Sequence, residues 1–184
     1  MNRENDKDTR VTPSNAFREW ATRIANDTAW GEQLARWIGK VPGELQLRWK
    51  VGTPTEIPWT PLKKPLAEAT LALVTTGGVH LCTDKPLVLK SDSTFRAIPR
   101  TATSADLCIT HEHYDRRDAA RDLNLVFPLQ RLLELEAEGI VGRVADTHYG
   151  FGFTDNPHEL LLPGHKVGTM LAQANVDLVL LVPA

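Results

Sequence analysis

Three short apolar runs along the chain predict its β-strands. Residues 69–76 and 176–182 are rich in leucine, valine and alanine, and residues 106–110 contain a shorter run of the same kind. Runs of this length are typical of strands buried on both faces of a sheet. Stretches with helical periodicity separate the runs, so parallel strands are expected. The pattern predicts an α/β fold with a doubly wound, mostly parallel sheet, like half of a Rossmann or flavodoxin-like domain.

Amphipathic stretches predict the helices. Phe17, Trp20 and Ile24 recur at spacings of three and four residues, which predicts an N-terminal helical region over residues 15–38. All five tryptophans of the chain lie between residues 20 and 59. The predicted N-terminal extension is therefore both helical and rich in tryptophan.

Further helices are expected behind Pro128, over residues 129–139, and over residues 166–175. Residues 140–144 are expected to form a short strand or a turn. Residues 85–100 lack a clear period and predict a surface loop, and residues 146–153 predict a flexible segment of glycines and aromatic residues.

The same patterns predict the domain organisation. Residues 1–14 have no apolar side chain between Met1 and Val11 and are expected to be disordered. Residues 15–60 hold the helical region and the start of a linker with prolines at positions 54, 58, 61 and 65. Residues 61–184 form the α/β domain. We expect this domain to be incomplete at its C-terminus, because nothing follows its last strand.

Composition and charge exclude several classes of function. The formal net charge is −2 and lysine and arginine do not cluster, which argues against a nucleic-acid partner. No apolar run approaches the ~20 residues of a membrane span, and the polar N-terminus does not resemble a signal peptide. A cytoplasmic protein is expected, with Cys82 and Cys108 as reduced thiols because neither lies in a CxxC motif.

Titratable side chains crowd directly after the apolar run at residues 106–110, where a ligand crevice lies in an open α/β sheet. The candidate catalytic residues are His111, His113 and Asp115. A helix start with salt bridges on its solvated face explains the charges beyond Arg116 equally well. The two histidines fit that alternative poorly, since they follow a strand.

A metal hydrolase is a second alternative. The pattern His111-x-His113-x-Asp115 resembles the opening of the dinuclear zinc motif of metallo-β-lactamase-like hydrolases. Another histidine normally follows in that motif, whereas Arg116 stands here, and its positive charge would oppose a second metal ion. We therefore expect no bound metal.

Ordered motifs over residues 57–184 resemble selenoprotein B of the glycine/sarcosine/betaine/D-proline reductase family. They are Pro58–Leu62, Ala72–His80, Phe95–Pro99, Thr110–Asp115, Asp122–Leu129, Glu138–Gly142 and His148–Tyr149. The resemblance implies a reductase that cleaves a C–N bond in an amino-acid-like substrate. A selenocysteine, or a cysteine in its place, attacks the α-carbon and displaces the amine, and dithiols then supply electrons. This nucleophile is expected after the strand at residues 176–182, just beyond Ala184, so the chain alone is expected to be inactive.

The resemblance also implies roles for the residues that remain. His111 or His113 is suited to act as the general acid, Asp115 to orient a histidine, and Arg116 to bind a substrate carboxylate through two hydrogen bonds. The full set of candidate substrate-binding residues is Gly77, Gly78, His80, Tyr114, Arg116, Asn124, His148 and Tyr149. We expect His80, His111 and His113 to gather at one edge of the sheet.

The expected partners follow from the same resemblance. They are a small amino-acid-like substrate, other subunits of a reductase complex, a thioredoxin-like electron donor and a second copy of the chain. No cofactor is expected apart from the selenocysteine. A non-catalytic interaction subunit remains a third alternative, because the N-terminal extension carries so many tryptophans.

Overall fold

The computed structural model describes residues 60–183. The predictions for the disordered tail, the tryptophan-rich helical region and most of the proline-rich linker concern residues 1–59 and lie outside the described residues.

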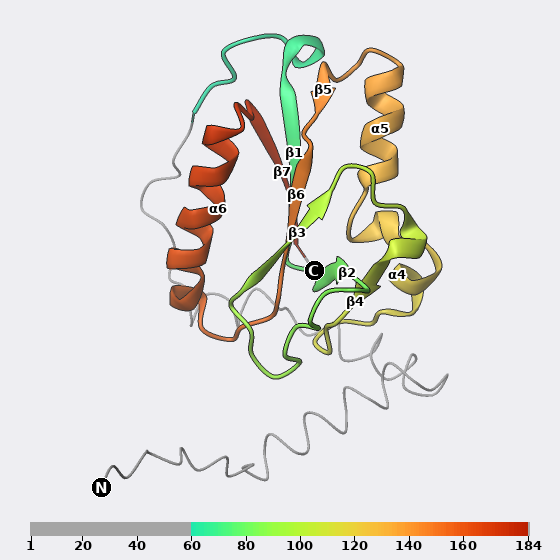
Figure 1. Ribbon diagram of the computed structural model, residues 1–184, viewed down its shortest axis with the longest axis vertical. Helices are drawn as coiled ribbons and strands as arrows, with labels where there is room; N and C mark the ends of the chain where they lie inside the picture. The colour runs from blue at the N-terminus through green and yellow to red at the C-terminus, as the bar shows by residue number, and fades with distance from the viewer. Residues whose placement is uncertain (1–59, 184) are drawn as a thin grey trace, which may run out of the picture.

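A mostly parallel sheet forms the centre of the described part (Figure 1). Its central strand is β1 (Thr70–Thr75), which pairs in parallel with β7 (Leu178–Val182) on one side. On its other side β1 pairs in parallel first with β5 (Arg143–Val144) and then with β6 (Thr147–Phe151). Strand β3 (Phe95–Pro99) adds to β6 in the antiparallel direction. The predicted α/β class and mostly parallel sheet are confirmed.

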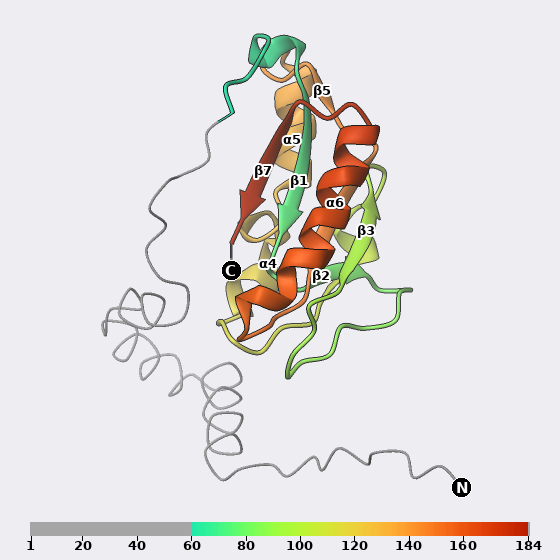
Figure 2. The ribbon, with the colours of Figure 1, turned by 90° about the vertical axis from the view of Figure 1, so that its left-hand side faces the viewer.

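Two helices cover opposite faces of this sheet (Figures 1 and 2). Helix α5 (Leu129–Ala137) packs on one face through a cluster that includes Leu71, Leu73 and Phe127. Helix α6 (Leu161–Gln173) packs on the other through Ala72, Val74 and Val167. Because successive residues of a strand point to opposite faces, β1 supplies side chains to both cores.

Short elements connect these layers. They are α4 (Arg117–Arg121) and the 3-10 helices η1 (Leu66–Glu68), η2 (Ser104–Asp106), η3 (Leu123–Leu125) and η4 (Pro157–Leu160).

The expectation that residues 106–110 form a parallel strand of the main sheet is wrong. Strand β4 (Leu107–Ile109) pairs antiparallel with β2 (Val79–Leu81) in a separate two-stranded sheet, here called the ribbon. Gly78, at φ 69°, turns the chain out of β1 and into β2, so β2 rather than β1 becomes the partner of β4. The apolar run predicts a strand, but it does not identify the strand's partner.

The ribbon also overturns the expectation of reduced thiols. Cys82 and Cys108 form a disulfide with their Cα atoms 5.0 Å apart, although 26 positions separate them in sequence. The antiparallel register places His80 opposite Cys108, so Cys82 lies diagonally across from Cys108 on the same face. That proximity depends on strand pairing, which the spacing of the two cysteines does not reveal.

Two strands occupy stretches that the sequence predicted to be irregular. Strand β3 lies within the expected loop at residues 85–100, and β6 lies within the expected flexible segment at residues 146–153. The glycine that suggests flexibility in β6 is required for packing. A Cβ atom on Gly150 would lie 1.9 Å from the carbonyl oxygen of Val79, so no larger residue fits there.

The predicted helices are confirmed with shifted ends. Helix α5 begins directly after Pro128, as expected. Helix α6 begins at Leu161, five residues before the predicted start at Lys166. Pro163 lies in its first turn, where a missing N–H costs no helical hydrogen bond.

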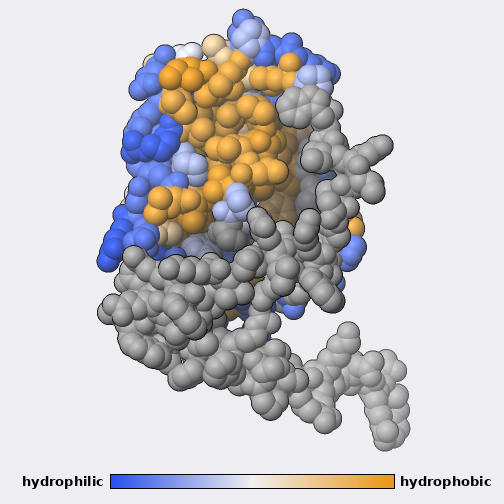
Figure 3. All heavy atoms as spheres, turned by 180° about the vertical axis from the view of Figure 1, so that it is seen from behind, coloured by the Kyte–Doolittle hydropathy of each residue, from blue (hydrophilic) through white to orange (hydrophobic). Residues whose placement is uncertain are grey.

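Strand β7 forms an edge of the sheet within the described residues. Its side chains Leu180 and Leu181 are exposed by 37% and 69%. Figure 3 shows an apolar surface in the middle of the back of the molecule, on the side where Figure 2 places β7. Charged residues usually protect a free edge strand from pairing with another chain, and β7 carries none.

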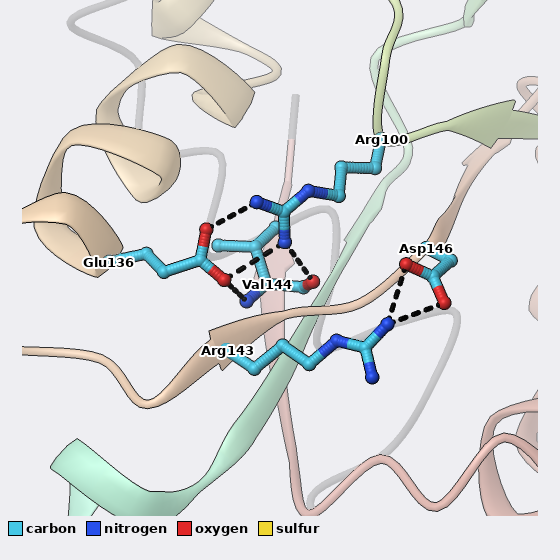
Figure 4. Close-up of polar contacts among 5 residues, drawn as sticks. All are labelled: Arg100, Glu136, Arg143, Val144 and Asp146. Carbon is cyan, nitrogen blue, oxygen red and sulfur yellow. Dashed lines mark hydrogen bonds and ion pairs between the residues drawn. The ribbon is translucent and has the colours of Figure 1, made fainter.

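A hydrogen-bond network fastens α5 to the sheet (Figure 4). The carboxylate of Glu136 accepts from both Nη atoms of Arg100, at 2.9 and 2.5 Å, and from the amide of Val144 at 2.8 Å. Arg100 also donates to the carbonyl oxygen of Val144 at 2.8 Å. These bonds join the end of β3, helix α5 and strand β5. They also hold the pKa of Glu136 below its usual value, chiefly through the hydrogen bond from Arg100.

We predict that Glu136→Gln lowers the free energy of unfolding by about 1–3 kcal/mol, because Arg100 keeps its charge in a half-buried site without a carboxylate. Urea denaturation measures this change. The control is Glu134→Gln on the same helix, whose exposed pair with Arg131 should contribute less than about 0.5 kcal/mol. Equal effects of the two substitutions would contradict the anchoring role.

Candidate functional site

The candidate site lies at the edge of the sheet where the parallel strands end. The amide of Thr76, just after β1, donates to the carbonyl oxygen of Val182 at the end of β7, at 3.2 Å. The amide of Gly78 donates to the carbonyl oxygen of Phe151 at the end of β6, at 3.1 Å. Three strand ends therefore meet at one place, which is the usual location of a ligand site in an open α/β sheet.

The ribbon delivers the segment Thr110–Tyr114 to this edge. The amide of Thr110 donates to the carbonyl oxygen of Gly78 at 2.9 Å, and the hydroxyl of Tyr114 donates to the carbonyl oxygen of Gly77 at 3.0 Å. The fit is close at Gly78, where an added Cβ atom would lie 2.3 Å from the oxygen of Thr110. The two glycines of the turn thus hold the segment through their backbone.

Four rings pack together at the edge and are here called the aromatic cluster: His111, His113, Tyr114 and Phe153. The ring of His113 stacks on Phe153 with centroids 3.5 Å apart and planes inclined by 12°. His111 lies 4.7 Å from Tyr114 and 5.5 Å from Phe153, measured between ring centroids. His111 and His113 meet edge to face at 5.8 Å. The cluster thus combines rings that follow β4 with one that follows β6.

The two histidines of the cluster differ in environment. The side chain of His111 is 3% exposed and its Nδ1 atom accepts a hydrogen bond from the His113 amide at 3.1 Å. Burial, helped by the nearby His113 and Arg116, lowers the pKa of His111 to about 4. The ring is therefore neutral at pH 7, with its proton on Nε2. His113, in contrast, is exposed.

Tyr114 remains protonated, because burial raises its pKa to about 12. His80 is connected to Thr110, the residue before His111. It is 2% exposed, its Nδ1–H donates to the carbonyl oxygen of Leu81 at 2.7 Å, and its Nε2 pairs with the hydroxyl of Thr110 at 2.8 Å. The structure thus brings His80, His111 and His113 to the same region.

The charged residues after the cluster differ in their hydrogen bonding. The carboxylate of Asp115 binds the guanidinium of Arg117, at 2.6 Å for the shortest contact, in addition to the Arg117 amide. Arg116 is close enough to depress the pKa of His111. Its Nε atom is buried and has no hydrogen-bond partner. Arg116 is therefore a cation with a donor still to be satisfied.

The remaining predicted residues lie outside the aromatic cluster. Asn124 sits in η3, where its side chain donates to the Asp122 carboxylate. Tyr149 is buried on the α6 face, edge to face with Phe95. His148 is fully buried in β6, and its Nδ1 atom accepts the amide hydrogen of Leu73 at 3.0 Å. Burial lowers its pKa to about 4. The structure assigns His148 to the core of the sheet.

Sequence reasoning did not single out Phe153 or Thr110. Phe153 lies in the glycine and aromatic segment, and only the path of β6 brings it beneath His113. Thr110 belongs to the motif Thr110–Asp115, and its position directly after the apolar run was the available signal.

The geometry does not favour the zinc hydrolase. Among residues 60–183, no group of three or more His, Cys, Asp or Glu side chains is placed to hold a metal ion. His111 Nδ1 is engaged by a backbone amide and Asp115 by Arg117, so the three residues of the pattern do not converge. The described helices also include none with the length and apolar character to span a membrane.

Fold and geometry together define an α/β protein whose candidate site combines histidine, tyrosine and arginine side chains at the end of the parallel strands. Residues 40–184 match the family of glycine/sarcosine/betaine reductase selenoprotein B, and the chain belongs to this family. The resemblance that the motifs indicated is thereby confirmed.

Individual relatives are consistent with this family assignment. The chain is 37% identical over 125 residues to D-proline reductase subunit gamma of Acetoanaerobium sticklandii, covering 67% of this chain and 52% of the relative. It is 31% identical over 132 residues to glycine reductase complex component B subunit gamma of Carboxydothermus hydrogenoformans, covering 68% and 30%. It is 28% identical over 116 residues to sarcosine reductase complex component B subunit beta of Peptoclostridium acidaminophilum, covering 59% and 26%.

The aligned parts span about half of the first relative and less than a third of the other two. No solved structure matches the chain.

We predict that Gly78→Ala destabilises the chain more than Gly139→Ala. Both glycines have positive φ, 69° and 74°, so both substitutions carry a backbone cost of roughly 1–2 kcal/mol. Only at Gly78 does the new methyl meet a carbonyl oxygen, which adds about 1–3 kcal/mol. Urea denaturation compares the two variants. Equal losses would show that Thr110 does not pack on Gly78.

We also predict that stability falls as the pH drops from 6.5 to about 4. The pKa of both His111 and His148 is lowered from 6.5 to about 4, so in this window the unfolded chain binds more protons. Each histidine contributes up to about 3 kcal/mol, fully present above pH 6.5 and lost as the pH approaches 4. His148→Asn, whose side-chain oxygen still accepts from Leu73, should remove about half of the fall.

Unfolding curves at pH 7.5, 5.5 and 4.5 test this expectation. His158→Gln, at an exposed position, is the control and should leave the pH slope unchanged. A slope that is the same in wild type and His148→Asn would contradict the proposed linkage.

Proposed function

We propose that this chain is a B-component-like subunit of a reductase complex of the glycine, sarcosine, betaine or D-proline type. The complex cleaves a C–N bond reductively in a small amino-acid-like substrate. Family membership supports this proposal, and the relatives are named as subunits of such reductases. The observation that carries it is the edge at which His111, His113, Tyr114 and Arg116 gather beside the end of β7.

The chemistry needs a nucleophile at that edge. In the proposed mechanism a selenolate or thiolate that follows β7 attacks the α-carbon of the substrate. The new bond forms as the C–N bond breaks, and the amine leaves with the bonding electron pair. A proton donor must neutralise the developing amide anion. A first thiol of a thioredoxin-like donor then attacks the selenium or sulfur, and the bond to the α-carbon breaks, leaving its electron pair on the carbon, which takes up a proton. The second donor thiol attacks the first donor sulfur in the resulting mixed selenosulfide or disulfide, which restores the nucleophile and leaves the donor as a disulfide.

His113 is the better proton donor of the two histidines in the cluster. His111 is neutral at pH 7, because burial lowers its pKa to about 4, and a neutral imidazole is a weak acid. His113 is exposed at the edge, and its ring is held in place by stacking on Phe153. In this mechanism His111 positions His113 by accepting its amide hydrogen.

Arg116 is suited to bind the substrate carboxylate. Its buried Nε donor has no hydrogen-bond partner, and a carboxylate that accepts from Nε and one Nη atom would satisfy it. Asp115 is held by Arg117 and is thus placed to orient the segment rather than a histidine.

Assembly into a larger complex is part of the proposal. The apolar edge of β7, with Leu180 and Leu181 exposed, agrees with a chain that works in contact with other subunits. A homo-oligomer and a cytoplasmic location belong to the same proposal.

In the assembled reductase, His113→Gln should lower kcat by about 10²–10⁴-fold with little change in KM, because the proton donor acts in the transition state. Arg116→Lys should instead raise KM about tenfold or more, because a bidentate contact to the substrate is lost. Steady-state kinetics with each amino-acid-like substrate measures both effects.

The control is His158→Gln, which lies in η4 and should keep wild-type kinetics. If the complexes containing His113→Gln and Arg116→Lys also keep wild-type turnover, the chain is a non-catalytic interaction subunit and the proposed site is wrong.

A further inference from the structure

The disulfide of the ribbon lies next to the candidate site. Cys108 lies in β4, three positions before His111, and Cys82 directly follows β2. The register places His80 opposite Cys108, and the Nε2 atom of His80 pairs with Thr110. The sulfur atoms, the buried imidazole and the first residue of the site segment therefore share one ribbon.

This disulfide is accessible from solvent. Cys82 is exposed and Cys108 is half-buried, whereas disulfides that only stabilise a core are usually enclosed. The ribbon is not part of the five-stranded sheet, and its backbone ladder does not depend on the sulfur atoms. The S–S bond can therefore open without separation of the main sheet from its helices.

We propose that Cys82 and Cys108 form a dithiol–disulfide exchange site for an external dithiol protein. One thiolate of that protein attacks the exposed sulfur of Cys82, the Cys82–Cys108 bond breaks, and Cys108 leaves as a thiolate. The second thiol of the donor then attacks the donor's first sulfur in the mixed disulfide, and Cys82 is released as a thiolate. Two electrons pass to the pair, the donor becomes a disulfide, and its two thiol protons end on the two cysteines.

His80 is the positioning residue of this exchange. Its Nδ1–H donates to the Leu81 carbonyl, and the hydroxyl of Thr110 can donate to Nε2 or accept from it. Both hydrogen bonds hold the imidazole in a fixed position opposite Cys108, on the same face of the ribbon.

The redox state of the pair is coupled to the site through Thr110. In the oxidised chain the disulfide locks the two strands together three positions before His111. Reduction frees this end of the ribbon, while the hydrogen bond from the Thr110 amide to Gly78 remains. The exchange itself is a property of this chain, and it depends on the proposed function only for its direction, because a reductase of this class receives electrons from dithiols.

The test uses the full chain without substrate or partner subunits, so its failure is separate from failure of the proposed function. The protein is equilibrated anaerobically with graded ratios of reduced to oxidised glutathione, and free thiols are trapped with a maleimide and counted by mass spectrometry. Circular dichroism of the same samples monitors the fold. We expect both cysteines of the chain to become labelled together while the spectrum stays that of the folded protein.

A disulfide that opens only when the chain unfolds would overturn the proposal and leave a purely structural crosslink. Failure of the bond to form in an excess of oxidised glutathione would overturn it as well. The variant Cys82→Ser, Cys108→Ser should remain folded and show no exchange, which separates the chemistry from loss of the ribbon.

The role of His80 is tested by the labelling rate of the reduced chain. Loss of the imidazole opposite Cys108 in His80→Gln should slow labelling at pH 7 about tenfold, because the polar group next to the reacting thiol is removed. His158→Gln is the matched control and should label at the wild-type rate. Equal rates for His80→Gln and wild type would exclude His80 from the exchange.

Discussion

One side-chain hydrogen bond completes the ladder on which the rest of the structure depends. Strand β1 is buried, so each of its backbone groups needs a partner on both edges. On one edge β7 pairs with it continuously, but on the other edge β5 ends at Val144 and β6 joins only at Tyr149. The amide of Leu73 falls opposite this break, and His148 Nδ1 accepts its hydrogen. Without that acceptor a buried donor would be left unsatisfied at a cost of about 1–3 kcal/mol.

The geometry of the candidate site depends on this hydrogen-bond ladder. Because β1, β6 and β7 are held in register, their ends meet, and the backbone of Gly77 and Gly78 becomes a support for the segment after β4. The same register carries β6 to Phe153, on which His113 stacks. The site therefore consists of residues from three separate parts of the chain, each placed by the paired strand that precedes it. A methyl group added at Gly78 would therefore meet the backbone of Thr110, which precedes the rings of the cluster.

Environment, rather than residue type, distinguishes the histidines. His148 is enclosed in the sheet and accepts a hydrogen bond from a backbone amide of β1. His111 is enclosed at the edge and accepts a hydrogen bond from the amide of His113, whereas the side chain of His113 faces solvent. Burial disfavours the charged form of the first two, which lowers the pKa of both. His80 is also buried, and its two ring nitrogens connect the Leu81 carbonyl to the Thr110 hydroxyl within the ribbon. One residue type thus supports four different physical roles within one small domain.

The sequence by itself determined the parts of this protein that rest on local pattern. The apolar runs specify β1 and β7, Pro128 marks the start of α5, and the ordered motifs identify the family, because each of these signals is contained in a few adjacent residues. The tertiary structure alone decided that β4 pairs with β2, that Cys82 meets Cys108, and that a segment with Gly150 is a central strand. The burial of His148 belongs to the same group. In each of these cases the deciding contact joins residues far apart in the chain, and sequence periodicity carries no information about which distant residue will be the partner.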